Sequence, residues 1–158
     1  MPSVGMVGQN GREMIHEFTH MLDNHDQAKI YHMTDCQQNS PMVDVLVVSD
    51  ASSKLDKLIS CLVPGGYLVV NADDREIFPY LPSGAKLITY GFSNKACITA
   101  SSVADDRLHI CIQRAFTALS GDVRDPQEFS AISIISPEAA LGAAAVWAIC
   151  SMNVNVSA

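Results

Sequence analysis

A glycine-rich turn near the N-terminus is the first place where residue types and spacing could bind an anion. It connects a short apolar segment to a helical pattern and reads Gly8-Gln9-Asn10-Gly11-Arg12-Glu13. Backbone N–H groups at the start of a helix can hold a phosphate. The nucleotide-binding version needs a Lys for the β- and γ-phosphates and a Ser or Thr hydroxyl for Mg²⁺. Arg12 and the repelling carboxylate of Glu13 stand at those places, so the turn is either a weakened phosphate site or a tight connection that binds nothing.

The segment that follows matches the H-E-x-x-H pattern of zinc metalloproteases. Its spacing places His16 and His20 on one helical face with Glu17 as the general base, and Asp26 falls where one branch of these enzymes has a third ligand. Only fifteen residues precede His16, too few for the sheet under which that helix normally packs. The histidines also lie opposite the apolar stripe of the helix. We therefore expect a solvated polar face without zinc, and we keep a zinc hydrolase as an alternative.

Acidic and amide side chains follow two expected strands at the edge where open α/β sheets bind ligands. Asn71, Asp73 and Asp74 come after one strand, and Asp50 comes after another. We expect the first three to belong to a nucleotide- or phosphate-binding site. Asp50 with Glu13 could hold a divalent cation. For each acid taken singly, a helix cap or a solvated loop end is the favoured alternative.

A mostly parallel sheet must position these residues. Strands are predicted at 3–7, 43–48, 67–70 and 85–90, with a further candidate at 29–33. The run at 43–48 is rich in β-branched residues, which is typical of a strand covered on both faces. Apolar residues at helical spacing predict a helix over 14–22, and a second helix is expected from Ser52 or Ser53 to Leu62.

The pattern changes after Gly91. Alternating segments at 96–103 and 107–117 predict an antiparallel hairpin, and 129–135 could add a third strand. Ser136 at the N-cap and Pro137 in the first turn begin a buried, Ala-rich helix. The expected fold is therefore α/β, a parallel sheet with flanking helices of the P-loop or Rossmann type plus a small antiparallel sheet. We expect one domain over 1–158, with these parts in 1–95 and 96–135 and a closing helix in 136–153.

Composition limits the classes of function. Hydrophobic residues make up 48% of the 158 residues, which suffices for a substantial core, and the net charge of −7 argues against general nucleic-acid binding. The apolar stretch Ala139–Cys150 is too short to span a membrane, and Met1–Gly11 lacks a signal-peptide pattern. The five cysteines are widely spaced without a CxxC pair. We expect reduced thiols and a cytoplasmic location.

Several motifs in order resemble the central domain of the Mur ligases, the ATP-dependent amide ligases of peptidoglycan precursor synthesis. The turn at residues 8–13 falls where that family has G-T-N-G-K-T/S. Val70–Asp74 is similar to its N-x-D-D segment, Leu87–Phe92 to its strand ending in Y/F-G, and Ala96–Ala100 to the first strand of its small antiparallel sheet. Pro137–Cys150 falls at its Ala-rich helix. The resemblance implies the fold given above and a site for ATP and Mg²⁺.

The departures from the family pattern fall on positions that do chemistry. Arg12 and Glu13 replace the Lys and the hydroxyl residue, and Ser49, with Asp50 beside it, stands where the family has a magnesium-ligating Glu. Lys54 or Lys57 could correspond to the carbamylated lysine of the family, and the last helix begins Ser136-Pro137-Glu138-Ala139 instead of with an Asn-rich segment. Counterparts of the two flanking substrate domains are expected to be missing.

We therefore expect a stand-alone Mur-ligase-like domain without complete ligase activity and with weak or lost ATP/Mg²⁺ binding. It would act as a binding or regulatory module in cell-wall precursor metabolism. The expected partners are a second copy of the chain, as a dimer, or another Mur-type or cell-wall protein, with no nucleic acid and no membrane. The alternative is a small enzyme with altered chemistry, either a nucleotide-dependent transferase or the zinc hydrolase.

Overall fold

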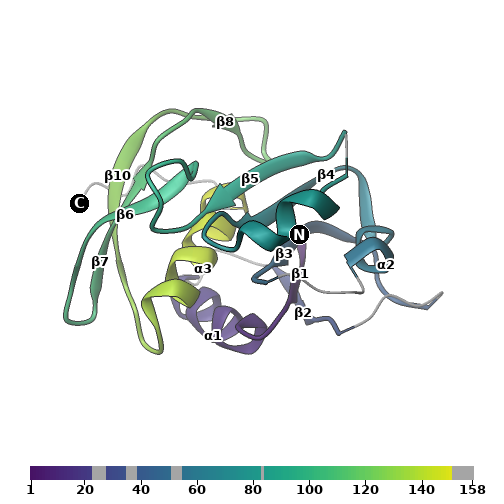
Figure 1. Cartoon of the computed structure of the whole chain (residues 1–158), viewed down its shortest axis with the longest axis horizontal. Helices are drawn as coiled ribbons and strands as arrows, with labels where there is room; N and C mark the ends of the chain where they lie inside the picture. Colours follow the sequence, from purple (N-terminus) through teal and green to yellow (C-terminus); the bar gives the residue numbers. More distant parts are fainter. Residues whose placement is uncertain (23–27, 35–38, 51–54, 83, 151–158) are drawn as a thin grey trace.

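The computed structural model of the chain, shown in Figure 1, describes all residues except 23–27, 35–38, 51–54, 83 and 151–158. Its eight-stranded sheet contains β1 (Ser3–Val7), β2 (Lys29–His32), β3 (Val43–Val48), β4 (Leu62–Asn71), β5 (Lys86–Tyr90), β6 (Ile98–Ala104), β7 (Arg107–Ile112) and β10 (Gln127–Ile132). The strand order is β10-β7-β6-β5-β4-β3-β1-β2. A separate two-stranded sheet pairs β8 (Phe116–Thr117) with β9 (Val123–Arg124).

Strand direction changes near one edge of the large sheet, between β6 and β7. The strands β2, β1, β3, β4 and β5 are parallel, whereas β7 pairs antiparallel with both β6 and β10. The two parts meet where β5 and β6 pair in parallel, and the register there consists of Tyr90 with Ile98. The α/β fold with a mostly parallel sheet and a small antiparallel sheet is confirmed.

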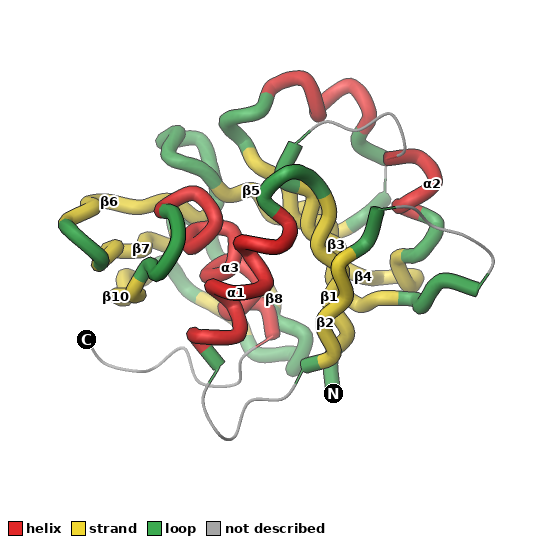
Figure 2. Tube along the Cα trace, turned by 90° about the horizontal axis from the view of Figure 1, so that it is seen from below, coloured by secondary structure: helices red, strands yellow, loops and turns green. Residues whose placement is uncertain are grey.

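Helices cover both faces of the parallel part. They are α1 (Gly11–Met21), α2 (Leu55–Ile59), the 3₁₀ helix η1 (Arg75–Tyr80) and α3 (Pro137–Cys150). Figure 2 shows α1 and α3 side by side on one face, with α2 on the other side of the strands. Each face has its own hydrophobic cluster: α1 and α3 contribute to one, and α2 and η1 contribute Leu55, Leu58 and Ile77 to the other.

Strand β3 shows why the sheet is covered twice. Its successive side chains point to opposite faces, so Val45 and Val47 pack in the cluster with α1 and α3, whereas Leu46 and Val48 pack in the cluster with α2. All four side chains are fully buried. The prediction of a two-sided buried strand at 43–48 is confirmed to the residue.

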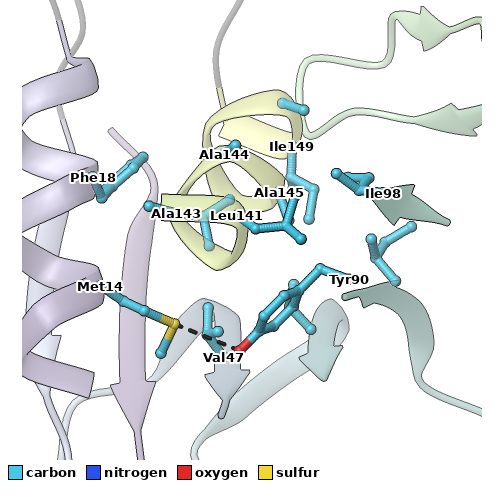
Figure 3. Close-up of a cluster of buried hydrophobic side chains, with 14 of the residues drawn as sticks. Met14, Phe18, Val47, Tyr90, Ile98, Leu141, Ala143, Ala144, Ala145 and Ile149 are labelled. Atoms are coloured by element: carbon cyan, nitrogen blue, oxygen red, sulfur yellow. Dashed lines mark hydrogen bonds between the residues drawn. The ribbon is translucent and has the colours of Figure 1, made fainter. Parts of the chain in front are cut away.

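The last helix, α3, is buried nearly all round because its small residues permit close approach. A Cβ atom at Gly142 would lie 2.8 Å from Met14 Sδ and 3.1 Å from Tyr90 Cζ. Figure 3 shows Met14 and Phe18 pointing from α1 toward α3, and the Tyr90 hydroxyl donates to Met14 Sδ at 3.7 Å. The predicted cap is confirmed, since Ser136 Oγ accepts from the Ala139 N–H at 3.2 Å.

Some expected boundaries are wrong. The second helix ends at Ile59 and not at 62, and β4 already begins at Leu62, so the turn-like Pro64-Gly65-Gly66 lies inside a strand. A register shift opposite Val43–Val45 and the positive φ of Gly65 accommodate it. The strand predicted at 107–117 ends at Ile112. The helix caps expected at Ser52 or Ser53 lie outside the described residues.

The expectation that all cysteines are reduced thiols is wrong at Cys61, which is disulfide-bonded. Cys97, Cys111 and Cys150 are free. Sequence spacing gave no indication of this bond, because the pairing of distant cysteines depends on the fold. In the part of the chain that the structure describes, no helix has the length and hydropathy needed to cross a membrane.

Candidate functional site

The glycine-rich turn lies between β1 and α1, at the edge of the sheet where the parallel strands end. Gly8 has a φ of 106°, a left-handed conformation that side chains other than that of glycine rarely adopt. The Gly11 N–H donates to the Gly8 carbonyl at 3.1 Å, which closes the turn, and α1 begins at Gly11. The backbone N–H groups of residues 9 and 10 thus come at the point where an anion would be expected.

Side chains from the end of β3 already accept hydrogen bonds from these N–H groups. The Gln9 N–H donates to Asp50 Oδ1 at 3.0 Å, and the Asn10 N–H donates to Ser49 Oγ at 3.4 Å. The Ser49 hydroxyl is buried and lies 3.2 Å from the Val7 carbonyl oxygen and 3.1 Å from Asp50 Oδ1. The turn is therefore bonded to a carboxylate of its own chain.

Glycine is required at position 8 by contact as well as by conformation. A Cβ atom there would lie 2.1 Å from Asp50 Oδ1 and 2.1 Å from Ser49 Oγ. Non-bonded atoms do not approach each other so closely, so any side chain at position 8 would displace Asp50 Oδ1, Ser49 Oγ or both. Gly8, Ser49 and Asp50 form one unit that joins the ends of β1 and β3.

Arg12 and Glu13, which stand where a nucleotide-binding loop has its Lys and its hydroxyl residue, lie in different environments. Arg12 is exposed to solvent. Glu13 is half-buried, and its Oε2 accepts from the Ser136 hydroxyl at 3.3 Å, at the start of α3. The proposed cation ligands Glu13 and Asp50 thus have hydrogen-bond donors of their own. Within the described ranges, no group of three or more His, Cys, Asp or Glu side chains could hold a metal ion.

The polar residues at the end of β4 and just after it stabilise the neighbouring loops. Asn71 Oδ1 accepts from the Asp73 N–H at 2.9 Å, and Asp74 Oδ1 accepts from the Glu76 N–H at 3.2 Å and so caps η1. The Asp73 carboxylate accepts from the N–H groups of Phe92 and Ser93, at 2.8 and 3.0 Å. These acids therefore lie at the expected edge of the sheet, where the structure gives each one a loop or a cap to stabilise.

Charge at this edge acts on a buried tyrosine. Burial raises the pKa of Tyr90 well above its ordinary value of 10, and the charges of Asp50 and Asp73 raise that pKa further. The two negative charges make ionisation of the Tyr90 hydroxyl less favourable. Tyr90 stays neutral and packs between α3 and α1, where its hydroxyl donates to Met14.

The H-E-x-x-H segment divides between two environments. His16 and His20 are exposed on α1, as expected for a solvated face, while Glu17 is fully buried. Its carboxylate accepts from the Ser133 hydroxyl and from the N–H groups of Ile134, Ile135 and Ser136, at distances of 2.7–3.2 Å. A carboxylate held in this way joins α1 to the start of α3 and is not oriented toward a metal-bound water. Asp26 lies outside the described residues.

The sequence does not predict the contact of Ser49 with the turn or that of Ser136 with Glu13. The only available signal was chemical, a hydroxyl residue directly after a strand or before a helix. Lys57 lies on α2, which covers the face opposite α1, and Lys54 lies outside the described residues.

Comparisons with known proteins give a structural likeness. No family model and no curated protein matches the sequence. A crystal structure of MurF from Acinetobacter baumannii superimposes with a TM-score of 0.64 at 9% identity, over 98% of this chain. The fold is Mur-ligase-like. A second MurF crystal structure and a structure of the UDP-N-acetylmuramoylalanyl-D-glutamyl-2,6-diaminopimelate–D-alanyl-D-alanyl ligase, both from the same organism, give TM-scores of 0.59 at 9% identity, over 99% of this chain.

The Mur-ligase-like fold accounts for less than half of those proteins. The chain spans 44%, 43% and 44% of the three matched chains. At 9% identity the likeness establishes the fold and carries no assignment of individual residues. The chemistry of the site must therefore be argued from this chain's own contacts.

Proposed function

We propose that this chain is a Mur-ligase-like domain of cell-wall precursor metabolism that does not complete the amide-ligase reaction by itself. It acts in the cytoplasm as a binding or regulatory module. The Mur-ligase-like fold over 98% of the chain and the order of the Mur-like motifs support this proposal. The proposal treats the β1–α1 turn as a phosphate-binding loop that has lost its strength.

The observation that carries the proposal is the pair Arg12 and Glu13. Phosphoryl transfer depends mainly on positioning and on neutralising charge around the transferred phosphate. Removing one preorganised electrostatic group typically costs about 10²–10³ in turnover. Here the hydroxyl position holds Glu13, which is hydrogen-bonded to Ser136, and the cationic position holds a solvent-exposed Arg12. Turnover should therefore be negligible, and affinity for Mg-ATP weak or absent.

A partner role is supported by apolar surface at the antiparallel end of the molecule. Val103, Ile132, Ile134 and Ile135 are each more than two-fifths exposed. The two loops at this end lie together, since the Ser133 N–H donates to the Asp106 carbonyl at 2.6 Å. Exposed apolar groups that gather at one end favour association. The partner is a second copy of the chain or another Mur-type protein.

Two measurements test the proposal. The purified chain is incubated with Mg-ATP, a UDP-linked muramyl peptide and D-alanyl-D-alanine, and phosphate release is followed; we expect none above background, and sustained turnover would overturn the proposal. In the native cell, removal of the protein should change the pools of UDP-linked cell-wall precursors. Unchanged pools would remove the assignment to this pathway.

A further inference from the structure

The β1–α1 turn is bonded to a negative charge that belongs to the chain itself. We propose that the Asp50 carboxylate occupies the position of a phosphate oxygen in this turn and thereby keeps phosphoanhydrides out of it. The contact is an autoinhibitory one: the internal acid accepts from the Gln9 N–H, and the Ser49 hydroxyl beside it accepts from the Asn10 N–H, so that neither group is open to a nucleotide. This inference rests on the proposed function, because it treats the turn as a former phosphate site.

The geometry is that of an anion bound by backbone N–H groups. Asp50 Oδ1 lies 3.0 Å from the Gln9 nitrogen and 3.1 Å from Ser49 Oγ, and Ser49 Oγ in turn accepts from the Asn10 N–H. Hydrogen bonds from N–H groups to a carboxylate are among the stronger ones in proteins. The carboxylate and the hydroxyl therefore cover two successive N–H groups, which is how a turn of this kind holds a phosphate.

The carboxylate is held in place by the sheet. Asp50 directly follows Ser49, whose N–H donates to the Val7 carbonyl at 3.0 Å, so that the end of β3 is fixed against the end of β1. A group that is already positioned needs little ordering when it binds. A free phosphate would have to displace this carboxylate and then remain beside its charge.

Gly8 shows that the turn is shaped around this contact. Its left-handed φ brings the chain so close to the end of β3 that a Cβ atom would lie 2.1 Å from Asp50 Oδ1. The charge of Asp50 is also among the causes that raise the pKa of Tyr90, so this carboxylate acts on a second buried group at the same edge of the sheet. Glu13, in the first turn of α1, accepts instead from the Ser136 hydroxyl, whereas Asp50 accepts from the turn itself.

The test compares Asp50→Asn with the wild type and with Asp73→Asn. Asp73 lies at the same edge, but its carboxylate accepts from Phe92 and Ser93, so its replacement removes one charge without touching the turn. Inorganic pyrophosphate is the probe, and the amide resonances of Gln9, Asn10 and Gly11 report binding. We expect Asp50→Asn to bind pyrophosphate at least tenfold more tightly than both other proteins.

Equal affinity in all three proteins would overturn the inference, and so would an equal gain in both variants, which would indicate bulk charge alone. If Asp50→Asn does not fold, Asp50→Ser keeps a short polar side chain without the charge and takes its place. Hydrogen exchange gives a second readout: the Gln9 amide should be protected in the wild type and should exchange at least tenfold faster in the variant. These outcomes are separate from ligase turnover by the wild type, which would overturn the proposed function instead.

Discussion

Replacing Glu17 tests the reassignment of the H-E-x-x-H segment from metal chemistry to structure. Glu17 is fully buried on α1, and its carboxylate receives hydrogen bonds from four donors in residues 133–136. Glu17→Ala removes the acceptor from all four and leaves a small gap between α1 and the start of α3. We expect a marked loss of stability with no dependence on zinc.

The magnitude follows from the number of bonds. A hydrogen bond to a charged group contributes about 1.5–3 kcal/mol. Ile134 and Ile135 are exposed, so water can replace the carboxylate at part of the loop. Counting half of the four bonds as lost gives a decrease of ~3–6 kcal/mol in the free energy of unfolding. A domain of this size shifts by ~2–4 °C in Tm for each kcal/mol, so the Tm should fall by at least ~6 °C.

Intrinsic fluorescence is a suitable assay because the chain contains one tryptophan. Trp147 lies on α3 with its ring centroid 5.4 Å from that of Phe129, so its emission reports on the packing of this helix. The matched control is Glu13→Gln, one turn earlier on α1, which weakens a single 3.3 Å bond to Ser136. We expect the control to lose less than about 1 kcal/mol.

The reasoning on Glu17 would be refuted by a Glu17→Ala protein whose Tm lies as close to the wild type as that of the control. A zinc role makes a different prediction. In that case wild-type protein would gain stability on addition of zinc, and His16→Ala and His20→Ala would abolish the gain. We expect both exposed histidines to be replaceable with a change in Tm of no more than ~2 °C.

Three further predictions concern the turn and the buried groups. Gly8→Ala should lower the free energy of unfolding by more than about 2 kcal/mol, and by more than Gly84→Ala does. Both glycines have positive φ, but of the two only Gly8 lacks room for a Cβ atom. Equal losses of the two variants in denaturant titrations would contradict this. Above pH 10 the free energy of unfolding should fall as pH rises, because Tyr90 stays protonated in the folded state, where its pKa is raised, but loses its proton in the unfolded chain. Tyr90→Phe should make the free energy of unfolding depend less steeply on pH in this range. An unchanged pH dependence would count against the burial of Tyr90. Burial, with a smaller effect from Asp44, raises the pKa of Cys150 to about 12. A thiol reagent at pH 8 should therefore label this residue only after denaturation. Rapid labelling of Cys150 in the native protein would contradict this, because it would show that the thiol is accessible.

The sequence predicts well what neighbouring residues determine. The strand at 43–48 follows from a run of β-branched residues, and the start of α3 follows from a Ser-Pro pair, because both signals act within a few residues. The start of β4 at Leu62 is not predicted by the sequence, for the same reason. Pro64-Gly65-Gly66 has the local character of a turn, and only pairing with β3 keeps it inside a strand.

The contacts of the candidate site could not be read in this way. Asp50 and Gln9 are 41 positions apart, and Glu17 and Ile135 are 118 positions apart. The packing of strands and helices decides which donor forms a hydrogen bond with a carboxylate over such separations. In the sequence alone, an acid that binds a ligand cannot be distinguished from one that caps a helix or accepts hydrogen bonds from a turn. The order of the motifs indicated the sheet edge correctly, but it did not reveal that the acids there are bonded to their own chain.

The join between the two parts of the sheet has a consequence for biosynthesis. The parallel strands and the antiparallel strands meet through Tyr90 and Ile98, and α3 packs against strands of both parts. A nascent chain that has emerged from the ribosome only as far as β10 lacks the helix that bridges them. Its two halves would present uncovered apolar faces to solvent until residues 137–150 are made. We therefore expect this domain to reach its native state only after their synthesis, with chaperones protecting it before then.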